Sequence, residues 1–459
     1  MKRWVRRLLF ALLLFAVAVG AVSLRTVNSS LPGPSDYGRR TYTRLQSELS
    51  SAPVCEDAPI EAGIGKAGLT PRIGLPLAGY GDRKGRPSTG VHDSLYVRCL
   101  ALSAGDCKIL LLTLEALIVP WEVARGVLDV LQRQVGLEPR SVYFGATHTH
   151  SGAGGWGRGP LAEAFAGPFA AEVVEMFVDS AVAAAVRAFR DLRPAEVFWD
   201  QFGAARWTAN RLVGERGQID SLFTFLAVRR DGKPLAVVGS FAAHATVLPA
   251  ENLEFSGDWP GYWSRALEQE GIPLAAYFAG GVGSHRPKGP GAGFERARAI
   301  GEALAQELLT RLPQASWRDR VSLRTVRVPI ELGPLQLRIS QKLTLAPWLG
   351  RKLLRPGPVW LSGLRIGDLV LLGAPADWSG ELTNELRATA DSLGLQVTVT
   401  SFNGGYVGYV VPDPYYPLDE YETRLMSFYG PHTGSYFLSL FRLLLSGLAG
   451  ERTGRQGLG

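Results

Sequence analysis

Two of the six histidines in this sequence, His148 and His150, lie in the short segment Thr147–Gly152. The segment follows Val142–Gly145, an apolar stretch with the composition of a buried strand. Because side chains alternate along a strand, residues two positions apart face the same side and can approach one ion. Imidazole nitrogen is a common zinc ligand. The spacing therefore predicts a metal site; a pair of histidines held by hydrogen bonds in a loop is the alternative.

A third histidine, His244, follows a second apolar stretch, Val237–Ala243. A single histidine in such a place is often a core residue satisfied by hydrogen bonds, and this interpretation stays open. Histidines at two strand ends can, however, meet at one edge of a mixed sheet. Zinc usually needs three or four ligands from imidazole, carboxylate or thiolate, and a catalytic site keeps one position free for water. Since no cysteine here has a spacing typical of a metal site, we expect the remaining ligand to be a carboxylate or a phenolate.

The rest of the chain supplies the elements that must position these side chains. Strand and helix patterns alternate through the first two thirds of the sequence, and strand patterns dominate later. We therefore expect an α/β (mixed α+β) fold, with one large catalytic domain of mixed sheets flanked by helices. The clearest predicted elements are a hairpin with strands at 95–98 and 108–112 and helices at 121–135, 169–192 and 295–312.

The N-terminus carries a targeting pattern. Four cations, Lys2, Arg3, Arg6 and Arg7, precede an uncharged apolar stretch that runs to Leu24. This layout is typical of the n-region and h-region of a signal peptide. Basic residues on the near side predict that the following chain is extracytoplasmic, whether secreted, periplasmic or membrane-anchored. Residues 1–24 are thus expected to be a cleaved signal or an anchor that brings the protein to a membrane surface.

Composition indicates what residues 25–58 form and which class of partner is excluded. Residues 25–58 are rich in Ser, Pro and Arg, and we interpret them as a linker ahead of a catalytic domain at 59–459. The net charge of +7 is spread thinly, with no extended basic run beyond the N-terminus. We therefore expect no nucleic-acid partner.

The three cysteines do not form the framework expected of a disulfide-rich secreted domain. Cys99 and Cys107 flank the turn Ser103–Asp106, so they could pair across the predicted hairpin. The other interpretation is that they are small buried residues.

Several short segments besides Thr147–Gly152 carry a family resemblance through their shared order. They are Gly63–Pro71, Leu77–Gly81, Gly90–Arg98, Asn210–Arg211, Phe241–His244, Ser256–Tyr262 and Tyr406–Glu422. In this order they resemble the motifs of the neutral/alkaline, non-lysosomal ceramidases, and Thr147–Gly152 matches that family's Thr-His-Thr-His-Ser-Gly motif outright. Each segment alone is weakly specific, whereas the series is specific and runs from residue 60 to residue 435.

The resemblance implies a zinc-dependent amidohydrolase with four metal ligands. These are the first histidine of His-x-His, a later histidine, an acidic residue and a tyrosine, which here become His148, His244, Asp377 and Tyr409. The family usually has Glu at the position of Asp377, so the carboxylate is one methylene shorter. Glu381 is therefore a substitute candidate. The alternative for this segment is a helix N-cap, with Asp377 or Ser379 ahead of an apparent helix that begins at Glu381.

The resemblance also implies roles in catalysis. Arg211 and Tyr421 match residues that contact the substrate and the oxyanion, and His150 matches a residue suited to proton transfer. The alternatives are an ion pair of Arg211 with Asp220, or a surface position, and ordinary aromatic packing for Tyr421.

Some regions depart from the family or stay ambiguous. In Gly281–Pro287, Ser284 replaces an acidic residue and Arg286 replaces a serine, while His285 is expected to be a solvated loop residue. The family's immunoglobulin-like C-terminal domain is expected to be absent. The segment Leu335–Arg355 mixes apolar and basic residues, which suits a lipid surface or a solvated helix.

Three functional hypotheses follow. The first is a zinc-dependent amidohydrolase that cleaves ceramide or a related N-acyl lipid, a lipid-like small molecule, into a fatty acid and an amine. The second is a zinc hydrolase of another N-acyl amine or an ester, motivated by the altered 281–287 segment. The third is a membrane-tethered, non-catalytic binding protein on a degenerate fold, motivated by Asp377 and Arg286.

Overall fold

Alternating apolar residues produce the strands that organise this protein, whose computed structural model describes residues 2–450. The predicted hairpin is present: its strands pair antiparallel around a turn at Gly105–Asp106. It forms part of a nine-stranded mixed sheet in which most neighbours are antiparallel. The strands of this sheet are β2 (Val54–Gly68), β4 (Tyr96–Ala104), β5 (Cys107–Leu114), β6 (Val142–Ala146), β7 (Arg193–Pro194), β15 (Arg320–Pro329), β17 (Trp360–Ile366), β18 (Leu369–Gly373) and β20 (Gln396–Thr400).

A second, four-stranded sheet packs against the first. Its inward side chains, such as Trp199, Leu226 and Phe278, join Leu100 and Leu111 of the large sheet in one buried cluster. Burial of this shared apolar face removes both sheets from water on one side and holds them together. The strands, in spatial order, are β13 (Leu274–Ala279), β11 (Lys233–Phe241), β10 (Leu222–Arg230) and β8 (Glu196–Gly203).

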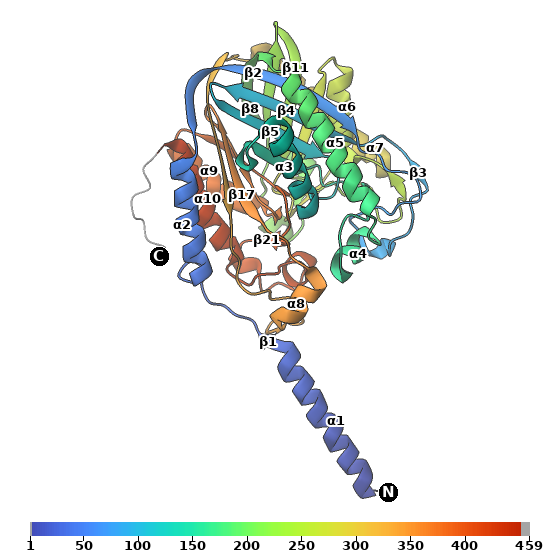
Figure 1. Ribbon diagram of the computed structural model, residues 1–459. Helices are drawn as coiled ribbons and strands as arrows, with labels where there is room; N and C mark the ends of the chain where they lie inside the picture. The colour runs from blue at the N-terminus through green and yellow to red at the C-terminus, as the bar shows by residue number, and fades with distance from the viewer. Residues whose placement is uncertain (1, 451–459) are drawn as a thin grey trace.

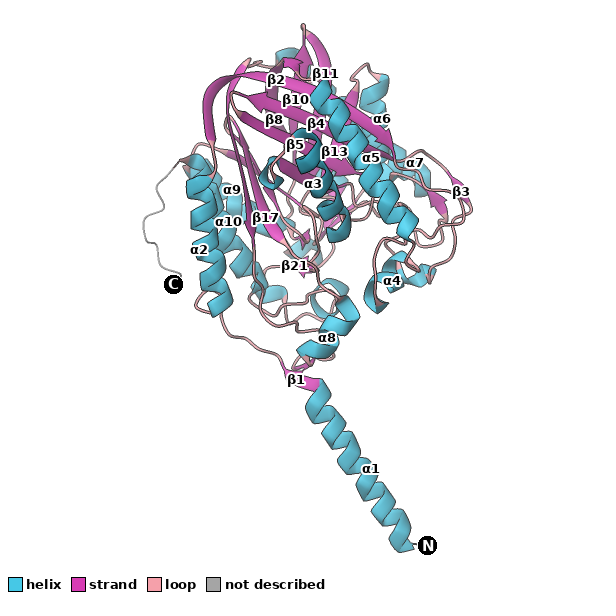
Figure 2. Cartoon of the chain, viewed as in Figure 1, coloured by secondary structure: helices cyan, strands magenta, loops and turns pink. Residues whose placement is uncertain are grey.

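Helices cover the outer faces of both sheets (Figures 1 and 2). In the first pair, one helix lies on β2 and β4 and its partner packs beside it. In the second pair, one helix lies on β13 of the four-stranded sheet and its partner packs beside it. A third group covers the β15–β20 half of the large sheet. The mixed α/β architecture with helix-flanked mixed sheets is thus confirmed. In the order of these groups, the helices are α3 (Trp121–Val135) and α5 (Ala171–Arg190); α6 (Asp258–Gln269) and α7 (Gly293–Leu309); and α2 (Asp36–Ser51), α9 (Gly380–Ser392) and α10 (Thr433–Ala449).

Short elements complete the described chain. Four two-stranded ladders link distant segments, and two short helices, α4 (Pro160–Ala166) and α8 (Pro347–Leu354), contact each other. The ladders are β1 (Leu24–Thr26) with β16 (Leu343–Leu345), β3 (Gly90–Val91) with β12 (Glu254–Phe255), β9 (Thr208–Asn210) with β14 (His285–Pro287), and β19 (Asp377–Trp378) with β21 (Tyr409–Val410).

Residues 25–58 differ from the expected linker. They contain the last two residues of β1, the whole of α2 and the first residues of β2. Helix α2 buries Thr41, Leu45 and Leu49, and it lies against β15 and α10. The polar composition misled the interpretation because only one narrow face of this helix is apolar, and that face is enough to attach it to the core.

The N-terminal helix α1 (Lys2–Ser23) extends away from the body (Figure 1). Among the described residues, no helix combines the length and apolar character needed to cross a membrane. The segment Leu335–Arg355 is not one helix face: it forms β16, α8 and their connections, with Arg338 buried and Trp348 exposed.

The cysteines also differ from the sequence interpretation. Cys55 and Cys107 form a disulfide that spans 52 residues, with Cα atoms 6.0 Å apart, and Cys99 is a buried free thiol. A Cys99–Cys107 bond is wrong because the hairpin register places Cys99 opposite Leu112 and Cys107 opposite Ala104. Cys107 instead bonds to Cys55, which lies at the start of β2.

The disulfide predicts a measurable contribution to stability. Cys107→Ser should lower the free energy of unfolding by about 2–4 kcal/mol, because the bond restricts the unfolded chain. Urea unfolding followed by tryptophan fluorescence measures this loss, with Cys55→Ser giving the same value and the double variant adding nothing. Thiol titration of the denatured, non-reduced protein should find one thiol; three thiols would contradict the bond.

Candidate functional site

Three histidine rings meet at one buried point. Their Nε2 atoms lie 2.8 Å apart for His148 and His244, 3.0 Å for His150 and His244, and 3.3 Å for His148 and His150. All three residues are buried. The structure therefore brings together the two histidines of the His-x-His segment and the strand-end histidine, and their three nitrogens could hold a metal ion.

The hydrogen bonds on the far side of the rings determine the tautomers. Nδ1 of His148 donates to the Leu117 carbonyl at 2.6 Å, and Nδ1 of His244 donates to the Val282 carbonyl at 3.1 Å. A neutral imidazole with its proton on Nδ1 presents a lone pair on Nε2. Burial lowers the pKa of His244 and of His150 well below the ordinary value, with the neighbouring charges adding to the effect. Two lone pairs consequently face each other, and a bound cation would stabilise that arrangement.

The two sheets place the rings. His148 and His150 follow β6 of the large sheet, and His244 follows β11 of the small one. The expectation of strand alternation through the His-x-His segment is wrong, because β6 ends at Ala146. Instead, His148 adopts a positive φ of 61°, a conformation that costs a non-glycine residue about 1–2 kcal/mol. Such strained backbone is typical of functional sites.

Asp377 reaches the same cluster from a third segment. Its Oδ1 lies 3.3 Å from Nε2 of His148 and has no hydrogen-bond partner among the described residues. Its Oδ2 accepts a hydrogen bond of 2.6 Å from the Tyr406 hydroxyl. Of the two N-cap candidates, Ser379 and not Asp377 occupies the N-cap position of α9. An unpaired buried carboxylate oxygen beside the imidazoles completes the kind of donor set that zinc binds.

Glu381, the substitute candidate, has other partners. Its carboxylate accepts hydrogen bonds from the Asn210 amide and from the hydroxyls of Ser284 and Ser379, so its oxygens are engaged. Neither oxygen lies in the histidine cluster that the structure describes between residues 2 and 450. Asp377 is therefore the acidic residue at the cluster.

The altered segment 281–287 is buried rather than solvated. His285, which we expected in solvent, is fully buried, and its Nε2 accepts a hydrogen bond of 2.8 Å from the backbone N–H of Asp220. The Ser284 carbonyl accepts from the Arg211 backbone N–H at 2.8 Å. The Val282 carbonyl orients His244. This segment thus supports two of the candidate site residues through its backbone.

Tyr409 and Arg211 form a hydrogen-bonded pair next to Asp377. The β19–β21 ladder pairs Asp377 directly with Tyr409, and Nη2 of Arg211 donates to the Tyr409 hydroxyl at 2.9 Å. Burial raises the pKa of Tyr409 well above its ordinary value, and the Arg211 charge opposes that rise. Arg211 Nε also lies 2.8 Å from Oε1 of Glu422. The alternative pair of Arg211 with Asp220 is wrong, because Asp220 pairs with Arg387 at 2.6 Å.

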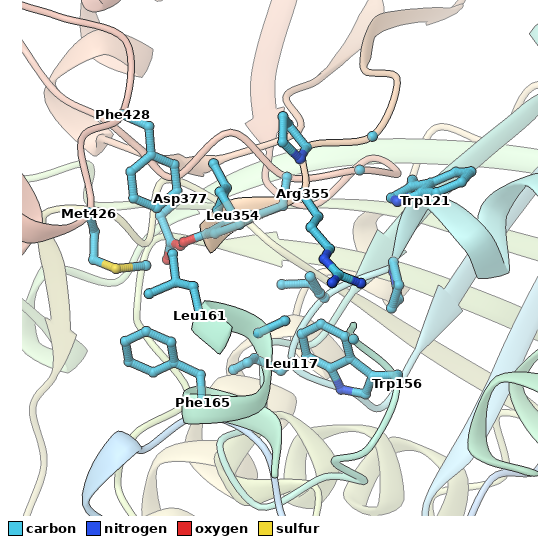
Figure 3. A pocket seen from close by; sticks show the side chains of 18 of the residues that line it. Leu117, Trp121, Trp156, Leu161, Phe165, Leu354, Arg355, Asp377, Met426 and Phe428 are labelled. Carbon is cyan, nitrogen blue, oxygen red and sulfur yellow. The ribbon is translucent and has the colours of Figure 1, made fainter. Parts of the chain in front are cut away.

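An apolar cavity opens onto the cluster (Figure 3). His148, His150, Asp377 and Tyr409 line it together with Tyr421, which packs edge-on against Tyr409 at 5.9 Å between ring centroids. Tyr421 is 40% exposed, so its side chain is not buried in an aromatic cluster. Apolar side chains form most of the remaining wall: Leu117, Ile118, Trp121, Trp156, Leu161, Phe165, Leu354, Met426 and Phe428.

Sequence reasoning missed three supporting side chains. Tyr406 orients Asp377, Glu422 pairs with Arg211, and Phe402 stacks on the His148 ring at 4.1 Å between centroids. Tyr406 and Glu422 lie at the ends of the Tyr406–Glu422 segment, which was available as a signal. The sequence contained no signal for Phe402, because its contact with His148 depends on a positive φ of 62° in a loop.

Comparison with known proteins identifies relatives of this site. A family model described as neutral/alkaline non-lysosomal ceramidase, N-terminal, matches residues 61–276. The neutral ceramidase of Pseudomonas aeruginosa is 24% identical over 493 residues, covering 86% of this chain and 72% of that protein. The neutral ceramidases of Mycobacterium tuberculosis and Oryza sativa subsp. japonica are 26% and 25% identical, and this chain spans only 33% and 31% of their lengths.

Solved structures show the same fold. The crystal structure of neutral ceramidase from Pseudomonas aeruginosa superposes with a TM-score of 0.75 at 21% identity, over 88% of this chain and 77% of that one. A structure described as ceramidase complexed with C2 gives the same TM-score over 85% of this chain and 75% of its own. The family-model match, the ordered motifs and the shared fold make this chain similar to the neutral/alkaline non-lysosomal ceramidases.

Proposed function

We propose that this protein is a zinc-dependent hydrolase that cleaves the linear amide bond of ceramide or a related N-acyl lipid. The observation that carries the proposal is the convergence of three buried imidazoles and an unpaired carboxylate oxygen at an apolar cavity. An apolar wall suits an acyl chain. The relatives named neutral ceramidase support the same reaction class.

The donor set fits zinc. His148, His244 and Asp377 would hold the ion with Tyr409, while His150 offers a further nitrogen at the same point. The three buried imidazoles, the unpaired Asp377 oxygen and the absence of thiolate from the described cluster match a nitrogen and oxygen site of the catalytic type. When bound, zinc would supply Lewis acidity toward the amide carbonyl and lower the pKa of water.

The chain's own residues would carry the remaining steps. Hydrolysis adds water across the C–N bond, so that a carboxylate leaves on one side and a protonated amine on the other. Tyr421 and the guanidinium of Arg211 would donate hydrogen bonds to the developing oxyanion. His150 would accept the proton that the attacking water releases and pass it to the leaving amine, since its buried neutral ring is adjacent and can first act as a base. The apolar wall would limit access of bulk water.

The same proposal places the protein outside the cytoplasm. Support comes from the basic residues ahead of the apolar N-terminal stretch and from the disulfide between Cys55 and Cys107. Structural disulfides persist in oxidising compartments. The N-terminal segment would bring the enzyme to a membrane surface, where lipid substrates are found.

The ligand assignment predicts the effect of His148→Ala. The variant should bind no stoichiometric zinc and release fatty acid from a fluorescent ceramide at the background rate, because one Nε2 donor is lost. His432→Ala is the matched control, since His432 pairs with Asp413 outside the cluster. Metal analysis of both purified proteins decides the point; an equivalent of zinc with normal turnover in His148→Ala would refute the site.

Metal and proton-transfer roles predict different outcomes for His150→Ala. As a proton carrier, His150 can be removed with zinc retained and kcat reduced by about a hundredfold to ten-thousandfold. The measurement combines metal content with turnover of the same fluorescent ceramide. Loss of zinc along with activity would instead make His150 a ligand.

Tyr421→Phe isolates the oxyanion contact. Removal of one donor should reduce kcat by about a hundredfold to a thousandfold with little change in KM. Tyr415→Phe is the control, because Tyr415 lies in the same aromatic segment but not in the cavity wall. Steady-state kinetics at constant zinc would show equal values for both variants if Tyr421 only packs.

A further inference from the structure

The cavity contains a guanidinium with no acidic partner. Arg355 lines the cavity beside Leu354, at the end of α8. Within residues 2–450, its side chain makes no ion pair and no hydrogen bond. Arg211, which lies next to Tyr409, is by contrast engaged by Glu422 and Tyr409. Arg355 is therefore available to bind a ligand.

The other charges of the cavity do not neutralise Arg355. Arg158 stacks on Phe169 with its guanidinium carbon 3.6 Å from the ring centroid. Glu122 is influenced by Arg158 and Arg125, whose charges oppose the rise in its pKa that burial causes. Asp377 is engaged by Tyr406 and the histidine cluster. Arg158 and Glu122 offset each other in charge, whereas Arg355, among the described residues that line the cavity, is a cation with neither a carboxylate nor a ring in contact, and such a charge attracts anions.

The backbone directs this side chain into the cavity. Arg355 ends α8 in the left-handed conformation, with φ 47° and ψ 58°, at a position where glycine is the usual residue. Its stem packs on Gly159: a Cβ there would lie 3.0 Å from Cδ of Arg355. Figure 3 shows the side chain extending between Trp121 and Trp156, with Asp377 on the other side of the cavity. Tight packing of the stem gives the guanidinium a defined position.

We propose that Arg355 is a specificity-determining residue that binds an anionic group of the substrate. The cavity would then take a linear N-acyl amine that carries a carboxylate, a sulfonate or a phosphate. A guanidinium presents paired N–H donors that match these groups in a two-point contact. The inference rests on the proposed hydrolysis and deepens it by naming the substrate class.

Matched amides test the inference directly. The substrates are N-dodecanoylglycine and N-dodecanoyltaurine, which are anionic, and N-dodecanoylethanolamine, which is neutral and has the same acyl chain. In the wild type, kcat/KM should be higher for both anions by about tenfold to a hundredfold, the range of a charged hydrogen bond. Arg355→Met should remove that preference and leave the neutral amide within about twofold, whereas Arg355→Lys should restore part of it.

Arg351→Met is the matched control, since Arg351 is exposed on α8 outside the cavity wall. It should keep the wild-type preference. A wild-type preference for the neutral amide, or equal losses on all three substrates in Arg355→Met, would overturn the inference. Preference for glycine alone or taurine alone would identify which anion the cavity accepts, and either result supports the role of Arg355.

A binding measurement separates this inference from the proposed reaction. Quenching of cavity tryptophans reports binding of dodecane-1-sulfonate and of uncharged 1-dodecanol without any turnover. The sulfonate should bind more tightly by about tenfold or more in the wild type, and Arg355→Met should abolish the difference. Failure of all three amides to react would reject the proposed hydrolysis only. Equal affinity for the two probes in the wild type would reject the role of Arg355.

Discussion

The arrangement of the site depends on two hydrogen bonds to backbone carbonyls. Leu117 and Val282 each accept an Nδ1–H, which leaves His148 and His244 with lone pairs that face each other at 2.8 Å. Two buried lone pairs at this separation repel, and a cation between them would turn that repulsion into coordination. The unpaired oxygen of Asp377 points to the same place. The cluster therefore brings together nitrogen and oxygen atoms that could hold a cation.

Such an arrangement needs a rigid frame, and the two packed sheets supply it. One ring follows a strand of the large sheet and the other follows a strand of the small sheet, so the apolar interface between the sheets sets their separation. Burial of that interface offsets the strain of the positive φ at His148. Asp377 and Tyr409 come from a further ladder in which they are directly paired. Packing across the whole domain thus determines the geometry of a few atoms.

The segment that supports the histidine cluster is distinct from the cavity wall, on which the proposed substrate specificity depends. The segment 281–287 departs from the family pattern, yet its backbone carbonyls still support His244 and Arg211. The acidic group comes instead from Glu381, which accepts from Ser284 within this buried network. The cavity wall is formed by other segments, and Arg355 lies in that wall at the C-terminal end of the short helix α8.

The sequence by itself determined the donors and the architecture. The His-x-His segment, His244 and the apolar strands before them are local patterns, and the helix at 121–135 has the predicted bounds because its spacing alone specifies its buried face. Only the tertiary structure decided which groups meet. It selected Asp377 over Glu381 and paired Arg211 with partners 198 and 211 positions away, and it joined Cys107 to Cys55. Local periodicity carries no information on such contacts, because they arise when strands distant in sequence come together at the junction of two sheets.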